Sequence, residues 1–146
     1  MTYKIKNGIK ESKEDILIKT KNLTKVYGKG DLAVKALDNI NLEIKRGEFI
    51  GIMGPSGSGK TTLLNMLGAL DKPTSGEIII DDIEISKVKE SKLYETRREK
   101  IGFIFQSFYL IPTLSALQNV LVPVLPLRKN KKDFGKRAYT LLKKVG

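Results

Sequence analysis

The sequence predicts an α/β fold in which a glycine-rich loop joins a buried strand to an amphipathic helix. Residues 49–53 form a nearly continuous apolar run, which is typical of a strand buried on both faces. Residues 54–61 match the phosphate-binding pattern G-x-x-x-x-G-K-[ST]. The helix is indicated by apolar side chains at i, i+3, i+4 and i+7, namely Leu63, Met66, Leu67 and Leu70. We expect it to stop at residues 71–73, since Pro73 disfavours helix in the residue before it.

Two half-buried strands of an antiparallel layer are expected before the glycine-rich loop. Ile16 and Ile18 mark the first. Alternating apolar residues mark the second, at Ile40, Leu42 and Ile44. The connection between the two strands carries Tyr27-Gly28-Lys29-Gly30. Residues 1–15 are rich in polar side chains, so we expect a disordered tail and no signal peptide there.

A hairpin, a polar helix and a further strand are expected after the loop. Asp81-Asp82 separates the apolar runs 77–80 and 83–85, and Asp tolerates the positive φ of a two-residue turn. A polar helix is expected over residues 87–100. The apolar run 101–105 predicts another strand, which ends at Gln106.

The pattern beyond Gln106 is helical. Ser115 and Gln118 have capping-box spacing before a short helix that reaches about Leu121. A longer amphipathic helix is expected after Asn130 as its N-cap. Its apolar stripe consists of Phe134, Ala138, Leu141, Leu142 and Val145.

Composition restricts the classes of function. The 27 basic and 16 acidic residues give a net charge of +11, which invites interaction with nucleic acids or anionic membranes. The basic residues are spread over both ends of the chain without the interleaved aromatic residues that stack on bases, so we favour a solvated surface and expect no nucleic-acid partner. The chain contains no cysteine and no histidine, which excludes disulfides, thiolate metal sites and histidine bases. No apolar run approaches about 20 residues, the length that spans a membrane.

The glycine-rich loop predicts that the chain binds a nucleoside triphosphate with magnesium. Gly54, Gly57 and Gly59 let the backbone wrap around phosphate oxygens, with the positive end of the following helix directed at them. Lys60 supplies a cation for the β- and γ-phosphates, and the Thr61 hydroxyl suits Mg²⁺.

Three segments in this order resemble the nucleotide-binding domain of ABC transporters, and most closely the lipoprotein-release, macrolide-export and cell-division subgroup. They are residues 54–62, residues 70–77 (LDKPTSGE) and residues 101–108 (IGFIFQSF). The resemblance runs from about Ile16 to the last residue. It implies a P-loop NTPase fold with an incomplete RecA-like core, an N-terminal antiparallel β layer and the start of a helical subdomain.

The resemblance also assigns roles to individual residues. Tyr27 matches the aromatic residue that stacks on adenine, and Gln106 matches the Q-loop glutamine that reaches Mg²⁺ and the attacking water. Ser107 to Val120 match the region that receives a membrane-embedded permease. The Walker A contacts to ATP and Mg²⁺ match Gly54, Pro55, Ser56, Gly57, Ser58, Gly59, Lys60, Thr61 and Thr62.

Several motifs of the family have no match in this chain. These are the signature sequence Leu-Ser-Gly-Gly-Gln, Walker B with the catalytic glutamate, the D-loop and the switch histidine. Residues 78–82 mimic Walker B, but the returning run 83–85 favours the hairpin. The chain therefore resembles the N-terminal portion of an ABC ATPase subunit, expected to bind ATP more than to hydrolyse it, and we expect its apolar core faces to be partly exposed.

The expected organisation follows from this resemblance: a tail over 1–15, an ATP-binding β layer and Walker A core over 16–106, and the start of a helical subdomain over 107–146. The expected partners are a permease and either a second ATPase subunit or a polypeptide that supplies the missing C-terminal half. The expected location is the inner face of the cell membrane, on the cytoplasmic side. The alternative of a truncated or interrupted gene product also stays open.

Two other functions remain open from the sequence. Gly54-Pro55-Ser56-Gly57 also resembles the loop of guanylate kinase, a nucleoside-monophosphate kinase, although no basic, aromatic segment for a phosphate acceptor is evident. The other is a non-catalytic or vestigial module that binds a transporter or nucleic acid through its charge, for which salt-dependent binding would be diagnostic.

Overall fold

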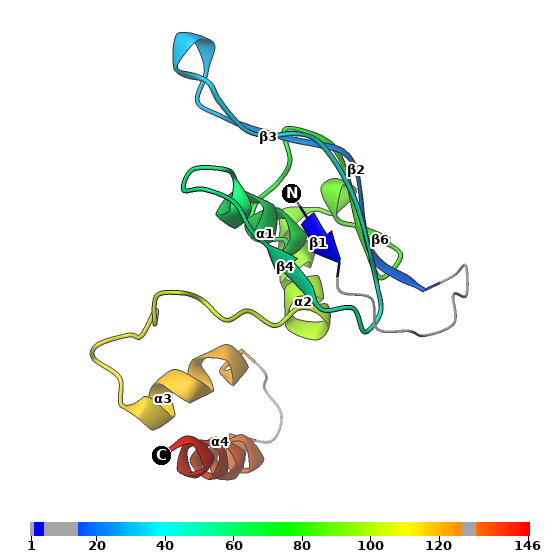
Figure 1. Ribbon diagram of the computed structural model, residues 1–146. Coiled ribbons are helices and arrows are strands. Elements are labelled where there is room, and N and C mark those ends of the chain that lie inside the picture. Colours follow the sequence, from blue (N-terminus) through cyan, green and yellow to red (C-terminus); the bar gives the residue numbers. More distant parts are fainter. Residues whose placement is uncertain (1, 5–14, 127–130) are drawn as a thin grey trace. The chain divides into compact units, whose positions relative to one another are not determined.

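The computed structural model describes residues 2–4, 15–126 and 131–146, and the chain divides into two compact units, residues 1–103 and 104–146. The first unit contains β1 (Thr2–Lys4), β2 (Ile16–Tyr27), β3 (Val34–Lys45), β4 (Ile50–Ile52), α1 (Lys60–Leu67), β5 (Ser75–Ile80), β6 (Ile83–Glu84) and α2 (Glu90–Lys100) (Figure 1). The second contains α3 (Ala116–Leu121) and α4 (Lys131–Val145). Short 3₁₀ turns occupy Gly30–Leu32, Ile85–Lys87 and Val122–Val124.

A four-stranded antiparallel sheet in the order β3-β2-β5-β6 forms the β layer. Thr20 of β2 pairs with Leu42 of β3 on one side and with Ile78 of β5 on the other. The alternating apolar pattern thus led to the correct antiparallel arrangement, although β2 and β3 extend further than the apolar residues alone indicate. Irregularities in the β2–β3 register allow these long strands to bend.

The hairpin expected at residues 77–85 is confirmed. Ile80 pairs with Ile83, and the two turn residues Asp81 and Asp82 have φ angles of 48° and 64°. Positive φ at both central positions is the property of the type I′ turn. The apolar run before Asp81 is therefore a hairpin strand of the β layer.

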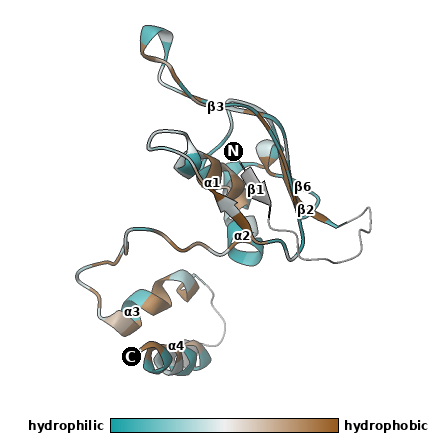
Figure 2. Ribbon diagram, viewed as in Figure 1, coloured by the Kyte–Doolittle hydropathy of each residue, from teal (hydrophilic) through white to brown (hydrophobic). Residues whose placement is uncertain are grey.

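The hydrophobic core lies between the sheet, α1 and α2. Its fully buried large side chains come from two strands and two helices: Leu23 from β2, Ile78 from β5, Met66 from α1 and Leu93 from α2. The rest of α2 is strongly hydrophilic, as the sequence indicates (Figure 2). Burial of these apolar side chains is the main force that holds the helices on the sheet.

The end of α1 and the start of α2 differ from the expectation. α1 ends at Leu67 instead of Leu70, because the amides of Ala69 and Leu70 bond back to the carbonyls of Met66 and Asn65 at 3.1 and 2.9 Å. This pattern is a Schellman motif, with Ala69 at the left-handed position (φ 53°) usually taken by glycine. α2 begins at Glu90 instead of residue 87, because a 3₁₀ turn occupies Ile85–Lys87.

The strand before the glycine-rich loop is less buried than its sequence predicts. β4 pairs only with β1 among the strands that the structure describes, and Phe49 and Met53 beside it are 84% and 63% exposed. Burial on both faces needs a strand on each side and covering helices, and within the described ranges β4 has a strand partner on one side alone. This corrects the expectation of a strand buried on both faces and confirms that the core faces are partly exposed.

β1 itself lies where a disordered tail was expected, and the other residues of that tail, except Asp15, lie outside the described residues.

The strand expected over residues 101–105 is not formed, which corrects the sequence interpretation. Among the described strand pairings, none includes these residues. Ile101 still packs against the core, whereas Ile104 is 99% exposed. An apolar run has strand propensity, but a strand also needs a hydrogen-bonded neighbour in a sheet.

The second unit contains the two expected helices. The capping box at the start of α3 is confirmed: the Ser115 hydroxyl accepts from the Gln118 amide at 3.3 Å, and the Gln118 side chain accepts from the Ser115 amide at 2.8 Å. Ala138 of the apolar stripe of α4 is buried. Asn130, the expected N-cap of α4, lies outside the described residues. In the described part of the chain, no helix has the length and apolar character that crossing a membrane requires.

Candidate functional site

The glycine-rich loop leads from β4 directly into the first turn of α1 (Figure 1). Gly59 is the N-cap of α1 and has a φ of 86°, in the left-handed region that favours glycine. A Cβ atom on Gly59 would lie 2.4 Å from the carbonyl oxygen of Ala36 in β3. The absence of a side chain thus lets the end of the loop lie directly against the β layer.

Lys60 folds its side chain over the loop. Its ammonium group donates hydrogen bonds to the carbonyl oxygens of Gly54 and Pro55, at 2.9 and 2.7 Å. A third, longer contact of 3.5 Å reaches the Ser58 hydroxyl. The positive charge of Lys60 therefore lies beside the backbone of the first two loop residues, Gly54 and Pro55.

The start of α1 adds a second source of positive potential. The first intrahelical bond joins the Leu63 amide to the Gly59 carbonyl at 2.8 Å, so the amides of the preceding helical residues have no carbonyl of their own helix to bond. These amides and the helix dipole favour an anion at this end. Thr61 is exposed there and Thr62 is half-buried. The structure brings together all the loop residues that the sequence singles out, Gly54 through Thr62.

Tyr27 lies at the end of β2 and is 41% exposed. Its hydroxyl donates a hydrogen bond to Oδ2 of Asp71 at 2.9 Å, and the Lys25 ammonium lies over its ring, 4.8 Å from the centroid. The sequence interpretation missed both neighbours. Lys25 could have been found from the two-residue period of a strand, which puts it on the same face as Tyr27. Asp71 lies 44 residues away and carries no local signal beyond its position after a helix.

The pKa of Asp71 is lowered from its ordinary value. Partial burial opposes this shift, but hydrogen bonds from the Lys25 ammonium, the Tyr27 hydroxyl and the Lys72 amide together outweigh it. Asp71 is therefore an ionised acceptor that gathers three donors beside the tyrosine.

Gln106 and residues 107–120 belong to the second unit. Gln106 is exposed at a bend. Several apolar side chains after it are also exposed, namely Phe108, Tyr109, Leu110 and Ile111. The Asn119 side chain fixes this segment to α3, since it accepts from the Ile111 amide at 2.8 Å and donates to the Leu114 carbonyl at 3.0 Å. The exposed apolar residues thus lie on an ordered loop.

Comparison with known proteins agrees with this arrangement. The family profile described as ABC transporter matches residues 37–146. The ABC transporter ATP-binding protein MJ0796 of Methanocaldococcus jannaschii is 55% identical over 109 residues, which are 75% of this chain and 46% of that protein. The macrolide export ATP-binding/permease protein MacB of Vibrio parahaemolyticus is 45% identical over 132 residues, 90% of this chain and 20% of that protein.

A solved structure of MJ0796 bears the same fold. The structure, a dimeric post-hydrolysis state of that ATP-binding cassette bound to ADP and phosphate, superposes with a TM-score of 0.78 at 50% identity. The alignment covers 86% of this chain and 56% of the solved one. The chain thus spans about half the length of MJ0796 and a fifth of MacB. The glycine-rich loop, the antiparallel β layer and these matches together establish that the chain belongs to the ABC transporter family, in its ATP-binding part.

Proposed function

We propose that this chain is the nucleotide-binding portion of an ATPase subunit that energises transport by a membrane partner. The observation that carries the proposal is the loop itself: the Lys60 ammonium and the free amide end of α1 meet beside the same glycine-rich backbone. Such a convergence of donors suits the phosphates of a nucleotide. In this proposal Gly54 through Thr62 hold the phosphates of ATP, and the ring of Tyr27 stacks on the adenine.

The residues present also fit a magnesium ion that arrives with the nucleotide. Among the residues that the structure describes, no group of three or more Asp or Glu side chains could hold a metal by itself. Mg²⁺ commonly takes few protein ligands and keeps substrate phosphates and waters as the others. The exposed Thr61 hydroxyl at the start of α1 is the proposed protein ligand. Gln106 is proposed as a further ligand on the resemblance alone. The ion would neutralise charge on the phosphates.

The exposed apolar segment after Gln106 supports a protein partner. A large contiguous apolar patch on the surface of a protein commonly marks an interaction site. Residues 107–120 are therefore proposed as the contact with a permease. The exposed Phe49 and Met53 beside β4 suit a second polypeptide that supplies the remaining core and the signature motif. Both partners would hold the chain at the cytoplasmic face of a membrane.

The test is calorimetric titration of the 146-residue chain with MgATP, ADP and GMP. Saturable MgATP binding at one site, weakened when Lys60 is replaced, is expected. Phosphate transfer from ATP to GMP would instead show a nucleoside-monophosphate kinase. Binding to DNA that falls with salt, without any binding of MgATP, would show a module that acts through its charge.

A further inference from the structure

The Asp71 carboxylate organises the surroundings of Tyr27 with both of its oxygens. Oδ1 accepts from the Lys25 ammonium at 2.8 Å and from the Lys72 amide at 2.7 Å. Oδ2 accepts from the Tyr27 hydroxyl at 2.9 Å. The tyrosine ring is therefore tied at its distal end to a residue on another segment of the chain.

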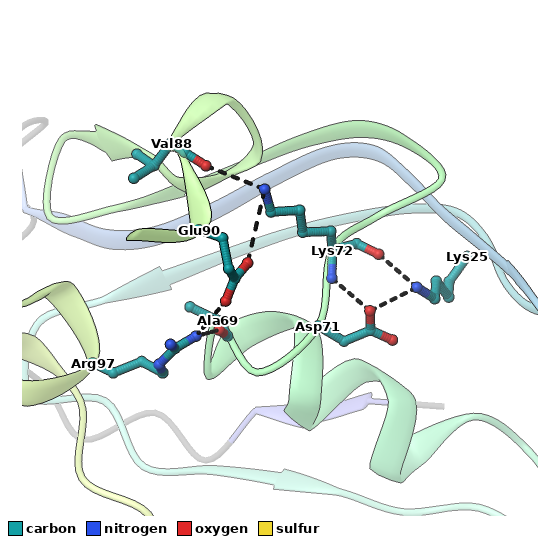
Figure 3. Close-up of polar contacts among 7 residues, drawn as sticks. All are labelled: Lys25, Ala69, Asp71, Lys72, Val88, Glu90 and Arg97. Atoms are coloured by element: carbon teal, nitrogen blue, oxygen red, sulfur yellow. Dashed lines mark hydrogen bonds and ion pairs between the residues drawn. The ribbon is translucent and has the colours of Figure 1, made fainter. Parts of the chain in front are cut away.

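The turn that carries Asp71 is itself fixed from several sides (Figure 3). The Lys25 ammonium also donates to the Lys72 carbonyl at 2.7 Å, and the Arg97 guanidinium donates to the Ala69 carbonyl at 2.8 Å. The Lys72 ammonium lies 3.8 Å from the Glu90 carboxylate. These contacts join the turn to β2 and α2, so Asp71 provides a stationary point of attachment.

Lys25 restricts which face of the ring is accessible. Its side chain is only 13% exposed, and its ammonium lies 4.8 Å from the ring centroid while bonded to Asp71 and Lys72. A planar base could stack on this face only by displacing a charge that is already hydrogen-bonded. The opposite face of the ring carries no such obstacle among the described contacts.

Tyr27 and the phosphate-binding loop lie at the same end of β3. Tyr27 pairs with Val34, and Gly59 lies against Ala36, two residues further along the strand. Two residues of a strand span about 7 Å. A single nucleotide can therefore contact the ring with its base and the loop with its phosphates.

We propose that Asp71 is a positioning residue for nucleotide binding: it holds the Tyr27 ring by its hydroxyl and, together with Lys25, leaves one face of the ring for the base. This inference rests on the proposed binding of ATP at the loop. Asp71 does not touch the nucleotide; it acts through Tyr27, which would otherwise lose side-chain freedom when the base binds.

The test separates the base from the phosphates. Affinities for MgATP and for magnesium tripolyphosphate, which has no base, are measured by calorimetry on the 146-residue chain. The variants are Tyr27→Phe, Asp71→Ala and the two combined. Each single variant is expected to lose about 2- to 10-fold in MgATP affinity, the effect of ordering one side chain on binding. The double variant should lose no more MgATP affinity than the single variant with the larger loss. All the variants should bind magnesium tripolyphosphate with equal affinity.

Asp38→Ala is the matched control, since it removes a carboxylate that bonds Lys35 on the same sheet and does not contact Tyr27. Tyr27→Phe keeps the ring and decides the question even if Asp71→Ala unfolds the chain. Additive losses in the double variant, or an equal loss of tripolyphosphate affinity, would overturn the positioning role. If Tyr27→Ala weakens MgATP binding but Tyr27→Phe does not, this inference fails and the proposed function stands. A wild-type chain that binds neither compound overturns both.

Discussion

The Lys60 ammonium lies 2.7 Å from the carbonyl oxygen of Pro55, five residues before it in the same loop. It is bonded to the Gly54 carbonyl as well. The loop backbone thus holds the cation that is proposed to bind phosphate together with this backbone. Both acceptors that hold the Lys60 ammonium are neutral carbonyl oxygens, and among the described residues no ion pair of Lys60 is seen. A phosphate can therefore replace these carbonyls as the acceptor. A hydrogen bond between charged groups is stronger than one to a neutral oxygen.

Replacing Lys60 by Ala should therefore weaken MgATP binding about 10- to 150-fold, the loss of a charge-assisted contact worth about 1.5–3 kcal/mol. Calorimetric titration measures this directly. Lys92→Ala, which removes the same charge from α2, is the control and should leave the affinity within about twofold of wild type. Equal binding by the Lys60 variant would remove this lysine from the site.

The glycines of the loop should differ in what they tolerate. Gly57 and Gly59 both have positive φ, 79° and 86°, but a Cβ on Gly57 meets open space whereas one on Gly59 meets the Ala36 carbonyl. Gly57→Ala should reduce the free energy of unfolding by about 1–2 kcal/mol, the conformational penalty alone. Gly59→Ala should cost clearly more. Urea denaturation without nucleotide measures both, and similar losses would mean that the loop does not lie against β3.

Stability should fall in acid partly through Asp81. Hydrogen bonds from Lys100 and then Arg46 lower the pKa of this carboxyl, and desolvation opposes them only in part. Because the folded pKa is below the unfolded value of about 3.9, the stabilisation is present above about pH 4 and is lost as the pH falls through the folded pKa.

The variant Asp81→Asn tests this directly, since Asn tolerates the φ of 48° at this turn. It should be less stable than wild type at pH 7 and should show a shallower loss of stability below pH 4. Urea midpoints measured from pH 7 to pH 3 give the comparison, with Asp38→Asn as the control. Parallel curves for the wild type and Asp81→Asn would argue against the ion pairs.

Binding and hydrolysis should be separable in this chain. The 146 residues carry no match to the catalytic glutamate or the signature motif, and hydrolysis needs a positioned water as well as charge neutralisation. Phosphate release by the chain alone should be negligible even where MgATP binds. Addition of a polypeptide that carries a signature motif and a catalytic glutamate should give turnover, and Gln106→Ala or Lys60→Ala in this chain should lower that rate.

Robust hydrolysis by the purified chain, abolished by Lys60→Ala, would contradict this prediction. The Lys60 variant serves as the control for a contaminating ATPase, because contamination would survive the substitution. A base would then have to be sought among Asp81 and Asp82 of the hairpin turn and Glu84 of β6.

The sequence predicted those features whose determinants lie in a few consecutive residues. The hairpin at Asp81-Asp82 follows from two residues that tolerate positive φ, and the capping box of α3 from Ser115 and Gln118. The phosphate-binding loop follows from its glycines and Lys60. In the capping box and the loop, the side chain and the backbone group that it contacts are at most six residues apart.

Whether an apolar run finds a strand partner could not be predicted from the run alone. The apolar runs at 49–53 and 101–105 have the same composition as buried strands, yet one forms a short strand flanked by exposed Phe49 and Met53 and the other forms none. Strand formation depends on a neighbouring strand, and burial depends on what covers it. Neither is encoded in the run itself.

By itself, then, the sequence determined the loop, its cation and the family to which they belong. Only the tertiary structure joined Asp71 to Tyr27 across 44 residues and set Gly59 against β3. The physical reason is that the pattern of a short segment fixes its local backbone, whereas the partner of a side chain such as the Tyr27 hydroxyl is decided by how distant segments pack together.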